Sequence, residues 1–214
     1  MHIEPGLISS IKLTAAGVTA VGVMGYYAKA LLLQPTLILR TLAAALFLTL
    51  FMQSVSMSVG PSELHFLGAM PLYLLLGFIP TLFGFALGLL LQGLLFDPAD
   101  MMNLAANSLS LILPLIALHY TIGQKIAAGG ISRLAILKLD AVFYAGVTGM
   151  VGFWLILSGT ATPFAAWAAF ASSYLVIVMI EPLLTYATIR LMKRHEQRPL
   201  LGNLFAIRSL KVAS

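Results

Sequence analysis

Long apolar runs recur along the whole chain and constrain its fold more than any other feature. A helix needs about 20 apolar residues to cross ~30 Å of hydrocarbon, so these runs predict an all-α, multi-pass bundle of about seven transmembrane helices. Residues 65–96 are too long for one helix and contain Pro71 and Pro80, which favours two short helices there. The runs cover residues 7–28, 41–59, 65–80, 81–96, 104–122, 139–158 and 164–190.

The composition argues against a water-soluble globule. Only 12 Lys and Arg and 7 Asp and Glu occur among the 214 residues, whereas 60% of the residues are apolar. Soluble domains carry about 25% charged residues. No hydrophilic segment is long enough to form a soluble ATPase or kinase domain. The sequence therefore predicts a chain of two parts. These are a single transmembrane domain over residues 1–190 and a basic cytoplasmic tail over residues 191–214.

The basic residues predict how the bundle is oriented. With the N-terminus outside and an odd number of crossings, every Lys and Arg except Lys12 falls in an inner loop or in the tail. Cytoplasmic loops carry an excess of Lys and Arg, so we expect the N-terminus outside and the C-terminus in the cytoplasm. The net charge of +5 therefore indicates topology in a lipid bilayer and not a nucleic-acid partner. Four acids then face outward: Glu4, Glu63, Asp97 and Asp100.

Two histidines on the predicted outer side suggest a metal site. The α-amine of Met1, the amide nitrogen of His2 and the imidazole of His2 can bind one ion in a plane, closing a five- and a six-membered ring. A fourth nitrogen, such as the imidazole of His65, completes a square, which is typical of Ni(II) or Cu(II). Without cysteine, such donors favour nickel, cobalt, copper or zinc. Since the donors must be deprotonated, affinity should fall as the pH drops.

This chelate requires that the chain keep its first residues. The opening segment is not a basic signal-peptide start, and no small-residue cleavage site follows it, so we expect residues 1–6 to be retained as a metal-binding segment. The residues alone also allow simpler interpretations. A histidine near a chain end is commonly only solvated, as His2 would be, and one at a helix entrance, such as His65, is commonly an interfacial hydrogen-bonding residue.

Several motifs link the chain to a known family. The opening Met1–Gly6 has the pattern Met-His-Ile-x-x-Gly, and His65–Gly68 has the pattern His-x-x-Gly. These motifs resemble those of the CbiM and NikM proteins, the substrate-specific membrane components of energy-coupling-factor transporters for cobalt and nickel. Further similar segments follow in the same order as in the family, at residues 91–96, 104–107, 180–185 and 198–201.

The resemblance implies a function and a set of ligands. It implies a seven-helix component of the bacterial inner membrane in which Met1, His2 and His65 hold the transported Co(II) or Ni(II), with no tightly bound cofactor. It also implies two partners, a membrane coupling subunit and a cytoplasmic ATPase. The chain has no Gly-x-x-x-x-Gly-Lys-Ser/Thr loop for nucleotide, so we expect a transport component and not an enzyme.

Three further polar residues are candidates for supporting roles. Glu63 either supplies a carboxylate that moves the preference from nickel toward cobalt or zinc, or points into water. Glu181 lies deep in the last apolar run, where an acid is costly and indicates function. Its expected partners are Asn107, Gln92, His119 or a backbone group exposed by Pro182. We expect Glu181 and Asn107 to hold ligands in place, and His119 to anchor a helix at the inner interface.

Two other classes of function remain open. A component of the same kind could carry another metal, such as zinc, or an organic vitamin. An intramembrane hydrolase is also open, although no Gly-x-Ser-x-Gly motif surrounds any serine. Its candidate nucleophiles are Ser9, Ser54, Ser62, Ser108 and Ser110.

Overall fold

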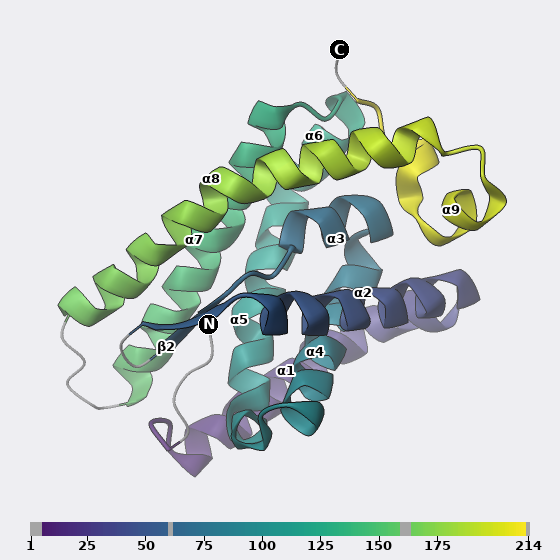
Figure 1. The fold of residues 1–214 in the computed structure, drawn as a ribbon. Helices are drawn as coiled ribbons and strands as arrows, with labels where there is room; N and C mark the ends of the chain where they lie inside the picture. The colour runs from purple at the N-terminus through teal and green to yellow at the C-terminus, as the bar shows by residue number, and fades with distance from the viewer. Residues whose placement is uncertain (1–5, 60–61, 159–163, 213–214) are drawn as a thin grey trace.

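The computed structural model describes residues 6–59, 62–158 and 164–212, and most of them are helical (Figure 1). Six helical segments among the described residues are long and apolar enough to cross a membrane, as an all-α multi-pass protein requires. The helices are α1 (Ser10–Leu32), α2 (Pro35–Ser54), α3 (Ala69–Leu76), α4 (Phe78–Leu95), α5 (Leu104–Leu118), α6 (Gln124–Gly129), α7 (Arg133–Ser158), α8 (Phe164–Arg194) and α9 (Pro199–Leu204). The shorter elements are strands β1 (Ser56–Val59) and β2 (Ser62–His65), 3-10 turns η1 (Pro98–Asn103) and η3 (Ala206–Ser209), and a π-helical turn η2 (His119–Gly123).

Helices α2 and α4 pack tightly and run in the same direction. Gly84 of α4 lies against Ala44 of α2, and Gly88, one turn later, lies against Leu48. The Thr49 hydroxyl donates to the carbonyl oxygen of Gly88 at 3.0 Å. A Cβ atom on either glycine would overlap α2, so the two small residues are what allows the helices to approach so closely.

Because α2 and α4 run parallel, the chain between them must return to the end of the bundle where α2 begins. Strands β1 and β2 form an antiparallel hairpin at the end of α2, and the Phe66 N–H donates to the carbonyl oxygen of Val55 at 3.1 Å. Residues 66–68 and α3 then lead into the interior as far as Gly77. Gly77 has a φ of +97°, which no helical residue has, and it therefore ends α3 before α4 begins. The return is therefore made by a hairpin, a loop and one short helix.

Residues 65–96 contain two helices, α3 and α4, as predicted, but the prediction that residues 65–80 form a transmembrane helix is wrong. The helix in this segment, α3, has only 8 residues and is about 12 Å long, too short to cross a membrane. Every residue of α3 except Pro71 is buried among the other helices. The side chains of this segment are apolar because they are buried among other helices, and not because the segment forms a lipid-facing transmembrane helix.

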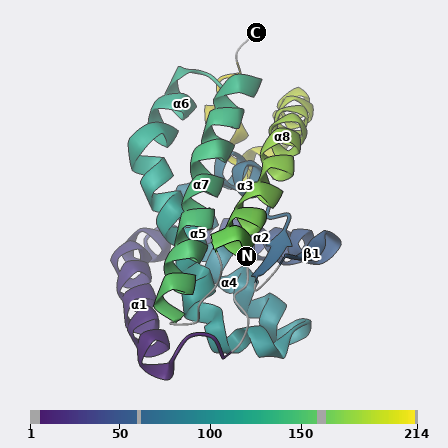
Figure 2. The same cartoon turned by 90° about the vertical axis from the view of Figure 1, so that its left-hand side faces the viewer.

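Helices α5 and α7 are antiparallel. The indole nitrogen of Trp154 donates to the Ser110 hydroxyl at 3.0 Å, and Gly146, further back along α7, lies against Pro114, further along α5. Figure 2 shows α5, α7 and α8 side by side. Helix α3 itself packs against α4, α8, α2 and α7.

Helices α7 and α8 are also antiparallel. The indole nitrogen of Trp167, near the start of α8, donates to the carbonyl oxygen of Thr148 at 3.0 Å. Further along α8, Glu181 accepts a hydrogen bond from Tyr144, which precedes Thr148 on α7. Helix α8 therefore runs back in the direction of α5.

Helix α1 runs in the same direction as α5. The Lys12 ammonium donates to the carbonyl oxygen of Leu157 at the last turn of α7, and Tyr27, near the other end of α1, contacts Tyr120 just after α5. Helix α1 consequently starts at the end of the bundle where α8 starts, and α8 ends at the opposite end.

One end of the bundle collects most of the positive charge, and we call it the basic end. It contains the last turns of α1 and α8, the first turns of α2 and α7, and α6. The tail folds back onto this end, with Ile207 and Leu210 buried in the main core and the Ile131 N–H donating to the Lys211 carbonyl oxygen at 2.7 Å. The basic residues that these helices bring to the basic end are Lys29, Arg40, Lys125, Arg133, Lys138, Arg190, Lys193 and Arg194.

The contact of α2 with α4 predicts a strong effect of side-chain size at Gly88. Gly88→Val should destabilise the protein by about 1–3 kcal/mol, because the new methyl groups meet the Ala45 carbonyl oxygen and Leu48. Gly149→Val is the matched control, since a Cβ at the exposed Gly149 meets no atom within 4 Å. Thermal unfolding in detergent measures both variants, and equal melting temperatures would contradict the packing described here.

Candidate metal site

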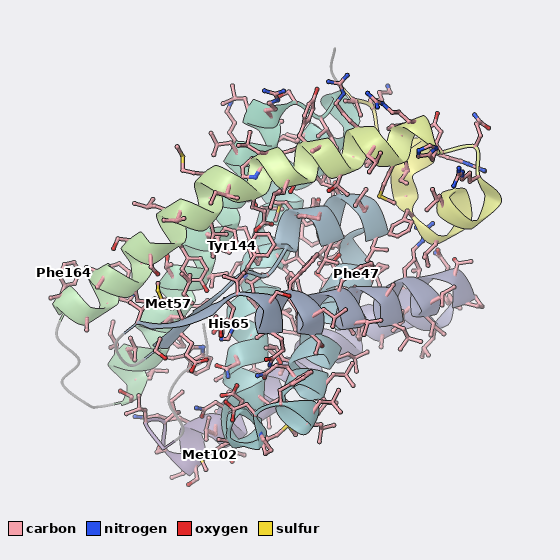
Figure 3. The ribbon with its side chains drawn as sticks, in the orientation of Figure 1. Phe47, Met57, His65, Met102, Tyr144 and Phe164 are labelled. Atoms are coloured by element: carbon pink, nitrogen blue, oxygen red, sulfur yellow. The ribbon has the colours of Figure 1, made fainter. Side chains whose placement is uncertain are left out.

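His65 is the predicted ligand that the structure describes, and it lies inside the protein. It is the last residue of β2, where it pairs with Ser56 of β1. Strand β2 lies between α2 and α8, and the side chain of His65 is directed into the protein (Figure 3). Only 3% of the residue is exposed, so His65 is not the solvated interfacial residue that a helix entrance would make it.

Two contacts orient the imidazole of His65. The Nδ1 atom lies 3.2 Å from the carbonyl oxygen of Met52. A carbonyl oxygen can only accept, so Nδ1 carries a hydrogen and donates it. This assignment leaves Nε2 as the ring atom whose lone pair can bind a metal ion. Backbone bonding at one nitrogen thus prepares the other nitrogen as a ligand.

Glu63 lies beside that second nitrogen. One of its carboxylate oxygens, Oε2, is 3.0 Å from Nε2 of His65, and 42% of the Glu63 side chain is exposed. A hydrogen on Nε2 would donate to this oxygen, and a cation in the place of that hydrogen would meet both a nitrogen and an oxygen ligand. Glu63 therefore faces the candidate ligand and not only water.

Met1 and His2 lie outside the described residues, so the structure leaves their part of the predicted chelate untested. Among the described residues, no group of three or more His, Cys, Asp or Glu side chains is arranged to hold a metal ion. The chain enters the described part at Gly6 and is then fixed by Ile8, which is 3% exposed and packs with Ala106 and Leu109 of α5. Asn107, between these two residues, is also buried.

The glycine of the His-x-x-Gly motif has a clear structural reason. Gly68 precedes α3 with a φ of +61°, a left-handed conformation that side chains disfavour. A Cβ there would also overlap the ring of Phe51 on α2. The motif thus combines the predicted ligand, His65, with the turn that starts α3 three residues later.

Glu181 holds the first turn of α3. Its Oε1 accepts a hydrogen bond from the Met70 N–H at 2.8 Å, and its Oε2 accepts one from the Tyr144 hydroxyl at 2.5 Å. The residue is completely buried. A carboxylate at a helix start satisfies N–H groups that have no partner within the helix. Glu181 therefore fixes the first turn of the helix that follows the His65 loop.

The partners of Glu181 differ from the side chains expected. Its hydrogen bonds go to the Tyr144 hydroxyl and to the Met70 N–H, a backbone group at the start of α3 and not one exposed by Pro182. Gln92 is buried on α4. His119 is half-buried in η2, where Nδ1 lies 2.9 Å from the Tyr73 hydroxyl and the ring stacks on Phe78.

Asp140 is a buried acid that sequence reasoning missed. It lies on α7 with 0% exposure, one turn before Tyr144, and its carboxyl is beside that of Glu181. The predicted span began at residue 139 and so placed Asp140 at a membrane edge, whereas α7 begins at Arg133. Tyr174 of α8 completes this buried polar cluster, with its ring stacked on Tyr144 and its hydroxyl beside the backbone of His65.

The fold and the site together define a polytopic helical membrane protein with a buried histidine and a supporting polar cluster. The model of the CbiM family, described as the cobalt uptake substrate-specific transmembrane region, matches residues 2–199. The chain therefore belongs to the CbiM family, which confirms the resemblance. This is a family of transport components for cobalt uptake and not of enzymes. Comparison with curated proteins and with solved structures gave no match.

The contacts of Glu181 predict a graded response to substitution. Glu181→Ala leaves the Met70 N–H and the Tyr144 hydroxyl without their acceptor, which costs about 1–3 kcal/mol for each buried group. Glu181→Gln keeps one carbonyl oxygen and should lose less. Thermal unfolding and metal titration of both variants test this, with Glu196→Ala as a partly exposed control. Unchanged stability of Glu181→Ala would show that the cap on α3 contributes nothing.

Proposed function

We propose that this chain is the substrate-binding membrane component of a cobalt uptake system, and that it captures Co(II) or Ni(II) on the outer side of a bacterial inner membrane. The ligands would be the Met1 amine, the amide and imidazole nitrogens of His2, and Nε2 of His65. The observation that carries the proposal is the buried His65, whose Nδ1 bonds to the Met52 carbonyl oxygen and whose Nε2 faces the Glu63 carboxylate, a second group able to bind a cation.

The start of the described chain supports the delivery of residues 1 and 2 to this region. Ile8 is fixed against α5 beside Asn107, at the end of the bundle where α1 starts. The hairpin that bears His65 begins where α2 ends, and α2 ends at the same end of the bundle, because α1 and α2 are joined by only two residues. Asn107 and Glu181 would keep these parts in place.

The direction of the helices and the basic end support the proposed orientation. With the six long helices and a return between α2 and α4, the chain would make an odd number of passes. Positive loops favour the cytoplasm, so the basic end would face inward and the end that bears the first residues would face outward. The proposed seven crossings would then include one that is not a full helix.

Two partners would complete the transporter. The chain itself has no nucleotide-binding loop, so the energy for uptake must come from a separate ATPase. A membrane coupling subunit would connect that ATPase to the bundle. We place both at the basic end, on the side where the ATPase hydrolyses its nucleotide.

The position of Glu63 favours cobalt over nickel as the preferred ion. Its carboxylate oxygen is 3.0 Å from Nε2 of His65, so it can approach an ion held by that nitrogen. Ni(II) suits a square-planar site with four nitrogen ligands. An added oxygen ligand raises the coordination number above four and so favours an ion other than square-planar Ni(II). Glu63→Gln should accordingly reduce the ratio of the Co(II) affinity to the Ni(II) affinity.

The test of the proposal is metal binding by the full chain with a native, untagged N-terminus. His2→Ala, His65→Ala or one extra residue before Met1 should each weaken Co(II) binding by more than about 100-fold. The substitutions each remove an imidazole ligand and the extension converts the Met1 amine into an amide, and even supporting residues cost about 10–100-fold. Calorimetric titration measures the affinity. His195→Ala is the control, since His195 is exposed after α8. Unaltered affinity in the extended chain would refute the chelate.

A further inference from the structure

A surface pocket at the basic end is lined by three arginines. It has a volume of about 380 Å³ and lies between the start of α7 and the last turns of α8. Arg133 comes from α7, and Arg190 and Arg194 come from α8, one turn apart. The remaining lining is one aromatic and three small or aliphatic side chains: Tyr186, Leu183, Ala187 and Leu191.

Two arginines of this pocket contact an aromatic ring, and no acidic side chain lines the pocket. The guanidinium carbons of Arg133 and Arg190 lie 5.3 Å and 5.9 Å from the ring centre of Tyr186, within the range of a cation–π contact. No Asp or Glu lines the pocket. The ion pairs recorded among the described residues leave these arginines out, and the nearby Glu196 is bound by Lys193 at 2.8 Å. The pocket thus presents concentrated positive charge to a ligand.

An exposed apolar stripe on α8 leads to the same pocket. Its residues recur every three or four positions, as one face of a helix requires, and Leu183 belongs to both the stripe and the pocket. Figure 1 shows α8 along the outside of the bundle, where this face is open. The stripe consists of Leu175, Val176, Met179, Ile180, Leu183 and Leu184, which are 48–69% exposed.

We infer that the arginine pocket binds the phosphate group of an anionic phospholipid, with the acyl chains lying along the α8 stripe. Arginine binds phosphate oxygens through two parallel N–H donors, and three guanidinium groups exceed what a zwitterionic headgroup can neutralise. Basic pockets between helices on the cytoplasmic side of membranes suit such headgroups. The stripe distinguishes the ligand from free phosphate, which has nothing to place on an apolar helix face.

The experiment uses the purified full chain in a neutral detergent, titrated with phosphatidylglycerol and, separately, phosphatidylcholine. Native mass spectrometry measures the bound lipid. Phosphatidylglycerol should bind about tenfold more tightly than phosphatidylcholine, and Arg133→Gln/Arg190→Gln should remove that difference, since each lost charged hydrogen bond is worth about tenfold. Lys125→Gln/Lys138→Gln removes the same charge from exposed positions of the basic end outside the pocket and should bind as the unchanged chain does.

Each alternative gives a different result. Equal loss in the two double variants would mean that overall charge attracts the lipid and would overturn the pocket. If inorganic phosphate at equal concentration displaced phosphatidylglycerol, the ligand would be a free anion and the lipid proposal would be wrong. If the arginine variant binds phosphatidylglycerol normally but fails to co-purify with the coupling subunit, the pocket is a protein docking site and the lipid proposal is wrong. Melting temperatures of the variants confirm that they are folded.

Discussion

The parallel packing of α2 against α4 is the constraint on which the rest of the structure depends. Two glycines one turn apart bring α4 against α2 over several turns, and no long helix of the opposite direction lies between them in sequence. The chain must therefore come back through the interior by way of the hairpin and α3. This return is what carries His65 from the surface, where a loop between two helices would place it, into the protein.

A polar cluster stabilises this return in an otherwise apolar core. Glu181 binds the start of α3 and Tyr144, while Asp140 and Tyr174 surround it. Buried acids are costly in a membrane protein, so their presence here marks a place where geometry matters more than stability. The cluster joins α7 and α8 to the segment that follows His65.

Much of the fold follows from the apolar runs, and the exceptions have physical causes. Periodicity does not tell a segment buried in protein from one buried in lipid, so residues 65–80 were predicted as a helix of their own. Helix ends are set by packing, so α7 starts six residues before the predicted span and Asp140 becomes an interior residue. The role of Glu181 in holding the ligands stays a prediction, and its partner Tyr144 lies 37 positions away, a contact that sequence spacing cannot reveal. For the site itself, His65 and Glu63 came from the sequence and adjoin in space, while Met1 and His2 remain predictions.

The central claim is that nitrogen atoms from the first two residues and from His65 meet on one transported ion. X-ray absorption at the metal edge of the untagged chain loaded with Co(II) tests it most directly. One ion per chain is expected, with a nitrogen-dominated ligand shell and the multiple-scattering pattern of imidazole, and this pattern should weaken in His65→Ala. An ion surrounded by oxygen alone, with no imidazole signal, would rule out this shared site.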